Sequence, residues 1–271
     1  YPCFEFITTD TTSRTAYSDY VTISYPNFNL RYDLDDDARR GEGEELLKKA
    51  WDTSGNGNHG TIYGATWKRD GKFGKALSFD GEDDKVIVSS EIDMGQNWTY
   101  TFRIKPLAYA QSDRATILRH MSEDSAEVAI RLKTDGKLQV VTVDSNKERI
   151  DIESTVALPL NEFTFVAVRR SESEDVLQIY LNGELNNSVS DTRSGTWNDL
   201  NTLLLGGGET GFECYTGYLD DIRSYVSAIS QSEIQNVMNN NASTANLVGE
   251  WKFDGGNNRG EVVIWDTRGE S

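Results

Sequence analysis

The 271-residue sequence has few cysteines, prolines and histidines, and it is short of positive charge. The two cysteines and two histidines are scattered along the sequence and form no zinc-type cluster, and no G-x-S-x-G motif suggests a Ser-His-Asp hydrolase. Lysine and arginine number 27 against 44 acidic residues, which gives a net charge of −17. Because nucleic acid is itself strongly negative, this balance argues against DNA or RNA as a partner.

Long hydrophobic runs are also absent, since no apolar stretch approaches the ~20 residues of a membrane-spanning helix. We therefore expect no membrane insertion. The 23 glycines and only four prolines, among many Thr, Val, Ile and Tyr residues, are typical of strands joined by turns. The acidic surface suits a calcium-rich medium, and together these features favour a secreted or cell-surface protein.

Short alternating stretches predict a series of strands separated by turn residues. The clearest is WTYTFRIKP at 98–106, which places four apolar side chains on one face: Trp98, Tyr100, Phe102 and Ile104. Further strands are expected at 20–25, 76–80, 84–89, 115–120, 126–132, 137–143, 163–170, 175–185, 201–208 and 215–227.

One short helix is expected at 230–240, where Ser230 and Glu233 have the spacing of a capping box. More than ten strands with one helix near the C-terminus predict an all-β fold. The expected architecture is a two-sheet antiparallel β-sandwich of the jelly-roll kind.

The stretch WDTSGNGNHGTIYGA at 51–65 contains a run that cannot pack into a core. Gly, Asn and Asp tolerate left-handed backbone angles, so the run is predicted to be a surface loop. It is unusually rich in side-chain oxygens, which come from Asp52, Thr53, Ser54, Asn56 and Asn58. Hard cations such as calcium favour these surroundings.

Several stretches occur in a distinctive order: WDTSGNGNHGTIYGATW, GKFGKALSFDGEDDKVIV, WTYTFRIKP, LQIYLNGEL and YTGYLDDIRSYVSAIS. In this order they resemble the laminin-G-like jelly-roll domains of the concanavalin A-like lectin/glucanase superfamily, over roughly residues 28–240. The family's first strand, an aromatic residue followed by a carboxylate, corresponds to Tyr32-Asp33. The charged stretch 35–50 departs from the pattern as an insertion.

The resemblance implies a calcium site where the Asn/Gly loop meets the strand near the chain's end. The corresponding residues are Asp52, Asn56, Asn58, His59 and either Asp220 or Asp221. We favour Asp221, because consecutive strand residues point to opposite faces. Asn58 and His59 would contribute backbone carbonyls, since imidazole is a poor calcium ligand. The alternative is a tight Asx-rich turn, with Asp221 paired to Arg223 or another cation.

Three regions are expected: an N-terminal extension packed on the domain (1–27), the sandwich (28–246) and a tail (247–271). The tail repeats the start of the domain, because Phe253-Asp254 resembles Tyr32-Asp33 and Trp265-Asp266-Thr267 resembles Trp51-Asp52-Thr53. It either begins a second repeat or closes the sheet of the same sandwich. We favour a second repeat, because the similarity includes the first residues of the loop.

Cys3 and Cys214 are either two buried thiols or one disulfide, and the features that indicate an extracellular protein favour the disulfide. The sequence also has N-x-[ST] motifs at Asn97, Asn186 and Asn241, which predict glycosylation acceptors.

Two further acidic stretches are candidates for an active site or a cation site. EIDMGQ at 91–96 partly resembles the active-site strand of glucanases of this fold, but Gln96 stands near where their second glutamate would fall. A retaining hydrolase needs that second carboxylate, so we predict no enzymatic activity. The second stretch contains Asp80, Glu82, Asp83 and Asp84. We interpret it as a hairpin turn with solvated charges, with a cation site as the alternative.

The predicted function is non-catalytic binding of a glycan or an extracellular protein, with a structural calcium. Trp197 and Tyr109 are the aromatic residues least committed to a strand face, so they are the candidate sugar-stacking rings. One alternative is a self-associating structural subunit of an extracellular filament, sheath or tandem adhesin. Another is an accessory domain of a polysaccharide-degrading enzyme, and the fold alone does not decide among these.

Overall fold

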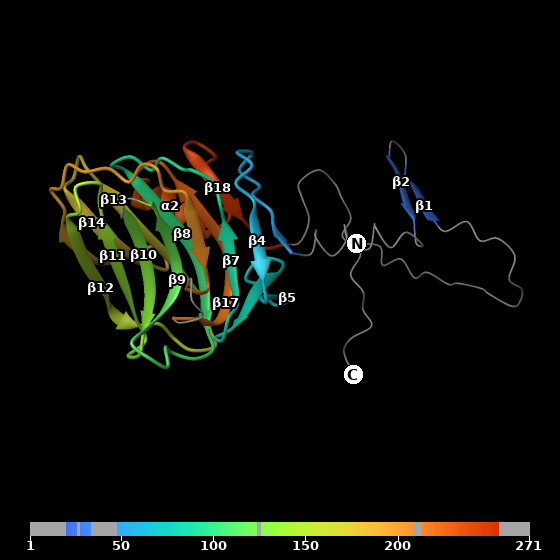
Figure 1. Ribbon diagram of the computed structural model, residues 1–271, viewed down its shortest axis with the longest axis horizontal. Helices are drawn as coiled ribbons and strands as arrows, with labels where there is room; N and C mark the ends of the chain where they lie inside the picture. Colours follow the sequence, from blue (N-terminus) through green and yellow to red (C-terminus); the bar gives the residue numbers. More distant parts are fainter. Residues whose placement is uncertain (1–19, 26–27, 34–47, 124–125, 209–212, 255–271) are drawn as a thin grey trace, which may run out of the picture. The chain divides into compact units, whose positions relative to one another are not determined.

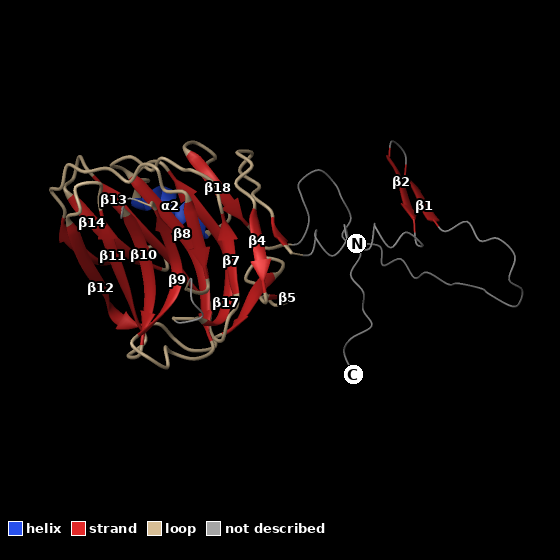
Figure 2. Cartoon of the chain, viewed as in Figure 1, coloured by secondary structure: helices blue, strands red, loops and turns tan. Residues whose placement is uncertain are grey.

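The computed structural model describes residues 20–25, 28–33, 48–123, 126–208 and 213–254. The chain divides into two compact units after residue 46. In the first unit, β1 (Tyr20–Tyr25) and β2 (Phe28–Asp33) pair as an antiparallel two-stranded sheet. The second unit is the predicted β-sandwich, with one short helix near its C-terminal end (Figures 1 and 2). No helix of the described ranges is long and apolar enough to cross a membrane.

One sheet of the sandwich has eight antiparallel strands. In spatial order they are β12 (Arg149–Ala157), β11 (Lys137–Val143), β10 (Glu127–Lys133), β9 (Arg114–Met121), β16 (Thr202–Leu205), β7 (Lys85–Val88), β4 (Gly60–Tyr63) and β3 (Lys49–Ala50). The β10–β11 hairpin turns at Asp135-Gly136, where Gly136 adopts a positive φ of 79° that suits glycine.

The opposite sheet also has eight strands, seven of which follow one path. These are β15 (Glu184–Ser190), β14 (Val176–Leu181), β13 (Thr164–Ser171), β8 (Trp98–Pro106), β17 (Thr216–Tyr225), β6 (Ala76–Asp80) and β5 (Thr66–Lys68). The eighth strand, β18 (Leu247–Trp251), pairs antiparallel with β17. Residues 247–251 therefore close the sheet of this same sandwich, which is the second of the two alternatives for the tail.

The main core lies between the two sheets. Alternate residues of β8 point into it, and the four side chains predicted to share a face are all fully buried there: Trp98, Tyr100, Phe102 and Ile104. This part of the sequence prediction is confirmed. The core continues into β18 through the fully buried Trp251.

A second, smaller core covers the outer face of the β8–β13–β17 sheet. The helix α2 (Gln231–Met238) contributes Ile234 and Val237 to it, and Phe165 and Tyr225 come from the strands beneath. The Ser230 capping box forms as predicted: its hydroxyl accepts from the Glu233 N–H, and the Glu233 carboxylate accepts from the Ser230 N–H. Thr99 of β8 is also fully buried, and its hydroxyl bonds to Ser227 and Ile229 in the segment that precedes α2.

Candidate functional site

The Asn/Gly loop at 51–59 joins β3 and β4 of one sheet but is fastened to β18 of the other. The side-chain amides of Asn56 and Asn58 donate to the carbonyls of Leu247 and Val248, at 3.0 and 2.7 Å. The Ser54 hydroxyl also reaches the Val248 carbonyl at 3.3 Å. These bonds satisfy backbone acceptors along an edge of β18 that no strand of the described residues covers.

Asp52 organises this loop from within. Its side chain is 6% exposed, and each carboxylate oxygen accepts two hydrogen bonds. The donors are the backbone N–H groups of Ser54, Asn58 and Glu250 and the hydroxyl of Ser54, at 2.8 to 2.9 Å. The ring Nδ1 of His59 accepts the Asp52 N–H at 3.0 Å. A carboxylate with four donors already holds the loop without a metal ion.

Asp221, the other predicted carboxylate ligand, lies at a bulge in β17. The register with β8 moves from Asp220–Arg103 to Arg223–Thr101, so two residues of β17 share one partner position. Asp221 has a positive φ of 53°, which turns it out of the alternation expected of a strand. Its Oδ2 lies 2.8 Å from Nη1 of Arg223 and 3.6 Å from Nε of Arg103.

Arg223 links Asp221 to Glu250 of β18. Its Nε donates to Oε1 of Glu250 at 2.8 Å, and the Thr53 hydroxyl donates to Oε2 of the same carboxylate at 2.5 Å. Burial opposes ionisation of Glu250, but the Thr53 bond and the charges of Arg223 and Lys252 together lower its pKa. An arginine side chain therefore supplies positive charge between these two carboxylates.

These contacts correct the predicted calcium set of Asp52, Asn56, Asn58, His59 and Asp221. The carboxylate oxygens face N–H, O–H or guanidinium donors, and the two asparagine amides donate toward β18. The residues do not fit a calcium ion. The observed arrangement matches the alternative, a tight Asx-rich turn with Asp221 paired to Arg223.

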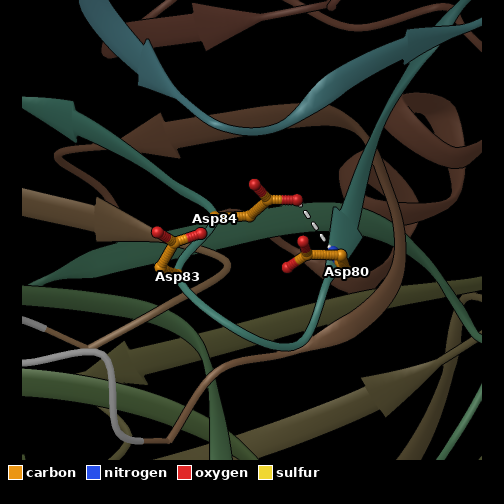
Figure 3. Close-up of side chains that lie close together, drawn as sticks. All are labelled: Asp80, Asp83 and Asp84. Atoms are coloured by element: carbon orange, nitrogen blue, oxygen red, sulfur yellow. Dashed lines mark hydrogen bonds between the residues drawn. The ribbon is translucent and has the colours of Figure 1, made fainter.

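The second acidic stretch offers a better cation site. Figure 3 shows Asp80, Asp83 and Asp84 around the turn between β6 and β7, and one carboxylate oxygen of each lies within 4.8 Å of the other two. The Asp80 N–H donates to the Asp84 carboxylate at 2.8 Å. Burial raises the pKa of Asp84, the Asp80 N–H opposes the rise, and the charges of Asp80 and Asp83 add to it. A bound cation would relieve this repulsion.

A small cavity of about 160 Å³ adjoins this acidic turn. Its lining includes Gly81 of the turn, together with Tyr109, Gln111, Arg114 and Glu213. Nε of Arg114 donates to Oε1 of Glu213 at 2.8 Å, so an arginine–glutamate ion pair lines the cavity. Such a mixture of ring, amide and charged groups can hydrogen-bond hydroxyls while contacting an apolar surface.

Tyr109, one of the two rings predicted to bind a ligand, is half-buried in this cavity. Its hydroxyl donates to the Leu158 carbonyl at 2.7 Å. The ring lies against Gly136, where an added Cβ would stand 2.5 Å from Cζ. The β10–β11 turn therefore fixes the ring, which is favourable for ligand binding because little side-chain freedom is left to lose.

Trp197, the other predicted ring, is not available to a ligand, and this prediction is wrong. The side chain is fully buried, with its ring centroid 5.7 Å from that of Trp98. Its Nε1 donates to the Glu127 carbonyl at 3.2 Å, and the guanidinium groups of Arg170 and Arg193 lie 5.3 and 5.0 Å from the ring. A residue outside any strand is here part of the core.

Glu91 and Asp93, the residues of the weak glucanase resemblance, lie beside Asp199 with carboxylate oxygens within 4.8 Å of one another. All three side chains are exposed. Gln96 instead donates its amide to the Ser194 carbonyl, so it ties two loops together. The group of Glu91, Asp93 and Asp199 lacks the buried carboxylic acid that a glycosidase uses as a proton donor.

The Cys214 thiol donates to the Glu82 carbonyl at 2.9 Å, next to the acidic turn. Cys3 lies outside the described residues, so its pairing with Cys214 stays a prediction. Among the glycosylation motifs, Asn241 is exposed, whereas the side-chain oxygens of Asn97 and Asn186 accept from the N–H groups of Glu172 and Thr155.

Comparison with known proteins identifies the fold. The sequence profile of the concanavalin A-like lectin/glucanases superfamily (Laminin_G_3) matches residues 80–235. No curated protein matches the chain in sequence.

The sandwich resembles domain 4 of AbnA, a GH43 extracellular arabinanase from Geobacillus stearothermophilus, in complex with arabinotriose. The TM-score is 0.58 at 18% identity, covering 72% of this chain and 94% of that one. It also resembles a heptameric SAP-like pentraxin from Limulus polyphemus, with a TM-score of 0.53 at 18% identity and coverage of 65% and 87%.

A third similar structure is the ligand-binding domain of botulinum neurotoxin serotype D in complex with N-acetylneuraminic acid. The TM-score is 0.57 at 17% identity, covering 73% of this chain and 51% of that one. The chain spans about half the length of the botulinum neurotoxin binding domains that it matches. The neurotoxin structures are named as binding domains, and the superfamily also includes glucanases.

Proposed function

Because the chain belongs to the concanavalin A-like lectin/glucanase superfamily, we propose that it is a non-catalytic, extracellular glycan-binding module. The observation that carries the proposal is the cavity around Tyr109, which lies directly beside three carboxylates. Two of the similar structures hold carbohydrate: one contains arabinotriose and the other N-acetylneuraminic acid. Their identity to this chain is 18% or less, so they indicate a class of ligand and not a particular sugar.

The chemistry of the cavity suits a neutral sugar unit. The Tyr109 ring offers an apolar surface, Gln111 offers an amide, and the Arg114–Glu213 pair offers both donors and acceptors for hydroxyl groups. The net charge of −17 would repel a highly acidic glycan. We therefore expect arabinose-type or other uncharged oligosaccharides to bind better than sialylated ones.

We further propose that the cation of this module is a calcium ion at Asp80, Asp83 and Asp84. Carboxylate oxygens gathered at a tight turn suit a hard cation that takes six to eight oxygen ligands. The ion would supply positive charge at the rim of the Tyr109 cavity. The residues of the chain would supply the ring and the polar groups that orient a bound sugar.

The test is a glycan array followed by titration calorimetry with the best oligosaccharide, for the native chain and for Tyr109→Ala and Gln111→Ala. We expect each substitution to weaken binding by roughly tenfold or more, because the contacts of the ring and amide are lost. The matched control is Tyr63→Ala, since Tyr63 is 48% exposed on β4 and does not line the cavity. Equal binding by Tyr109→Ala and the native chain would refute this site.

The similarity to an arabinanase domain gives specific support to a second candidate, an accessory module of a polysaccharide-degrading enzyme. That role requires the same glycan binding and no hydrolysis by this chain. Release of reducing sugar from β-glucans by the purified protein, abolished by Glu91→Gln, would contradict both forms of the proposal.

A further inference from the structure

β18 occupies a groove that holds it along both edges. On one side it pairs with Ile222–Tyr225 of β17, in the register Ile222–Trp251, Arg223–Glu250 and Ser224–Gly249. On the other side the backbone and side chains of residues 53–58 bond to its main chain, including a 2.8 Å bond from the Thr53 N–H to the Glu250 carbonyl. We call this groove, formed by Ile222–Tyr225 and residues 52–58, the strand seat.

The strand seat selects particular side chains as well as a backbone. At Gly249 an added Cβ would stand 2.3 Å from Cη2 of Trp251, in the same strand, and 2.8 Å from Oγ of Ser224 in the seat, so a larger residue conflicts with both. The Glu250 carboxylate pairs with the buried Arg223. The indole of Trp251 is fully buried, and its Nε1 donates to the Asn58 carbonyl at 2.8 Å. The pattern Gly-Glu-Trp is therefore recognised residue by residue.

The chain contains a second segment of related sequence that lacks these features. Aligning Tyr32-Asp33 with Phe253-Asp254 places Phe28 at the position of Gly249 and Asn29 at the position of Glu250. The same alignment places Leu30 at the position of Trp251, so the indole that crowds Gly249 is missing from this segment. Asn29 carries no charge for Arg223.

Sequence similarity and structure assign the segment 247–254 to different units. By sequence it belongs with the start of a repeat, since Phe253-Asp254 resembles Tyr32-Asp33 and Trp265-Asp266-Thr267 resembles Trp51-Asp52-Thr53. By structure it completes the sandwich that precedes it. A strand that opens one unit and closes another is a means of joining units.

We propose that the strand seat is an interaction site whose partner is a second copy of this chain, which inserts its own residues 247–254. Every contact of β18 would be reproduced in the exchange, so only the path of the connection between α2 and β18 changes. The residues of that connection, 239–246, are mostly exposed. The inference is independent of the proposed glycan binding, because the seat shares no residue with the Tyr109 cavity.

The first test uses the full-length Gly249→Val variant, whose seat is intact but whose own strand does not fit. A fluorescent peptide of residues 246–255 is titrated against it and followed by anisotropy. We expect saturable binding with one peptide per chain. A peptide of residues 25–34, the chain's related segment, is the matched control, and we expect it to bind at least roughly tenfold more weakly because it lacks the charge partner of Arg223. Equal binding of the two peptides, or no binding by a folded variant, would overturn the proposal.

The second test mixes Gly249→Val with Arg223→Ala, which has an intact strand and an impaired seat. Exchange predicts that the mixture forms a dimer in light scattering, of twice the mass of one chain, which neither variant forms alone. If Gly249→Val does not fold, a protease site placed within 241–245 of the otherwise native chain allows β18 to be cut free after folding. Replacement of the cut strand by the 246–255 peptide supports the proposal, and failure of replacement in a chain that stays folded refutes it.

Discussion

Arg223 and Glu250 face each other across β17 and β18, with Nε of Arg223 2.8 Å from Oε1 of Glu250. Their side chains are 2% and 11% exposed. Arg223 also pairs with Asp221 of its own strand. Through Glu250 the same guanidinium links β17, which precedes α2, to β18, which follows it. Removing Arg223 would leave the buried Glu250 carboxylate without its guanidinium partner, and removing Glu250 would leave Arg223 with Asp221 alone.

We predict that Glu250→Gln lowers the free energy of unfolding by roughly 3 kcal/mol, the lower end of the range for breaking a buried pair, because Arg223 keeps Asp221. Urea denaturation measures the change. The matched control is Asp151→Asn, which breaks the exposed Arg149–Asp151 pair. It should cost about 1 kcal/mol or less, since exposed pairs contribute little. Equal losses in the two variants would show that the β18 contact is not energetically special.

Asp220 predicts a pH dependence of stability. Burial raises the pKa of this carboxyl to about 7, the N–H groups of Phe73 and Lys72 oppose the rise, and the charge of Asp221 adds to it. The folded chain therefore holds a proton that the unfolded chain releases near pH 4. The resulting stabilisation is complete below pH 4 and is lost as the pH rises to about 7.

Asp220→Asn should flatten this profile, because the amide cannot ionise while its oxygen still accepts the Lys72 N–H. Between pH 4 and pH 8, the free energy of unfolding should fall by on the order of 2–4 kcal/mol more in the native chain than in the variant. Urea denaturation at several pH values measures it, with Asp135→Asn in an exposed turn as the control. Parallel profiles for the native chain and Asp220→Asn would contradict the assignment.

Metal removal tests the acidic turn. If calcium binds the folded state at a hundredfold excess over its dissociation constant, it stabilises by about 2.7 kcal/mol. Chelation should then lower the melting temperature by roughly 5–10 °C, and calcium should restore it. Asp83→Asn should abolish this response, whereas Asp175→Asn, at an exposed turn between β13 and β14, should keep it. A melting temperature that does not change with chelator would exclude a structural calcium at this turn.

Thiol counting tests the predicted disulfide. A Cys3–Cys214 bond closes a long loop and would contribute about 4–5 kcal/mol on the chain-entropy view. Intact-mass analysis after alkylation of the native protein should then show no adduct, and reduction should expose two reactive thiols. Two adducts without reduction would show that Cys214 keeps only its bond to the Glu82 carbonyl.

Local pattern predicted the strands and the helix cap well, because burial on one face imposes a period that is visible along the chain. β8 and Ser230 are examples. β12 was missed, because it is an edge strand with mostly exposed side chains and little apolar alternation. Trp197 differs for the opposite reason: it lies outside any strand but packs against Trp98 of β8 and Arg170 of β13, contacts that no local pattern describes.

The role of the Asn/Gly loop could not be predicted from its residues alone. Its composition suggested oxygen ligands for a cation, but the Asp52 carboxylate accepts the N–H of Glu250, which is 198 positions away. Asp221 depends on a bulge that breaks strand alternation. In the sequence, the repeated Phe253-Asp254 pair marks the segment that the loop contacts. The repeat alone does not show that this segment returns to the same sandwich.

The position of β18 in the chain also has a consequence for biosynthesis. The Asn/Gly loop that contacts β18 is synthesised early, near residue 52, and β17 follows much later. The ribosome must deliver residue 251 before the sheet edge beside Ile222–Tyr225 is covered. Until then a nascent chain exposes unpaired backbone groups along that edge, and the Arg223 guanidinium has Asp221 but not Glu250 as its partner.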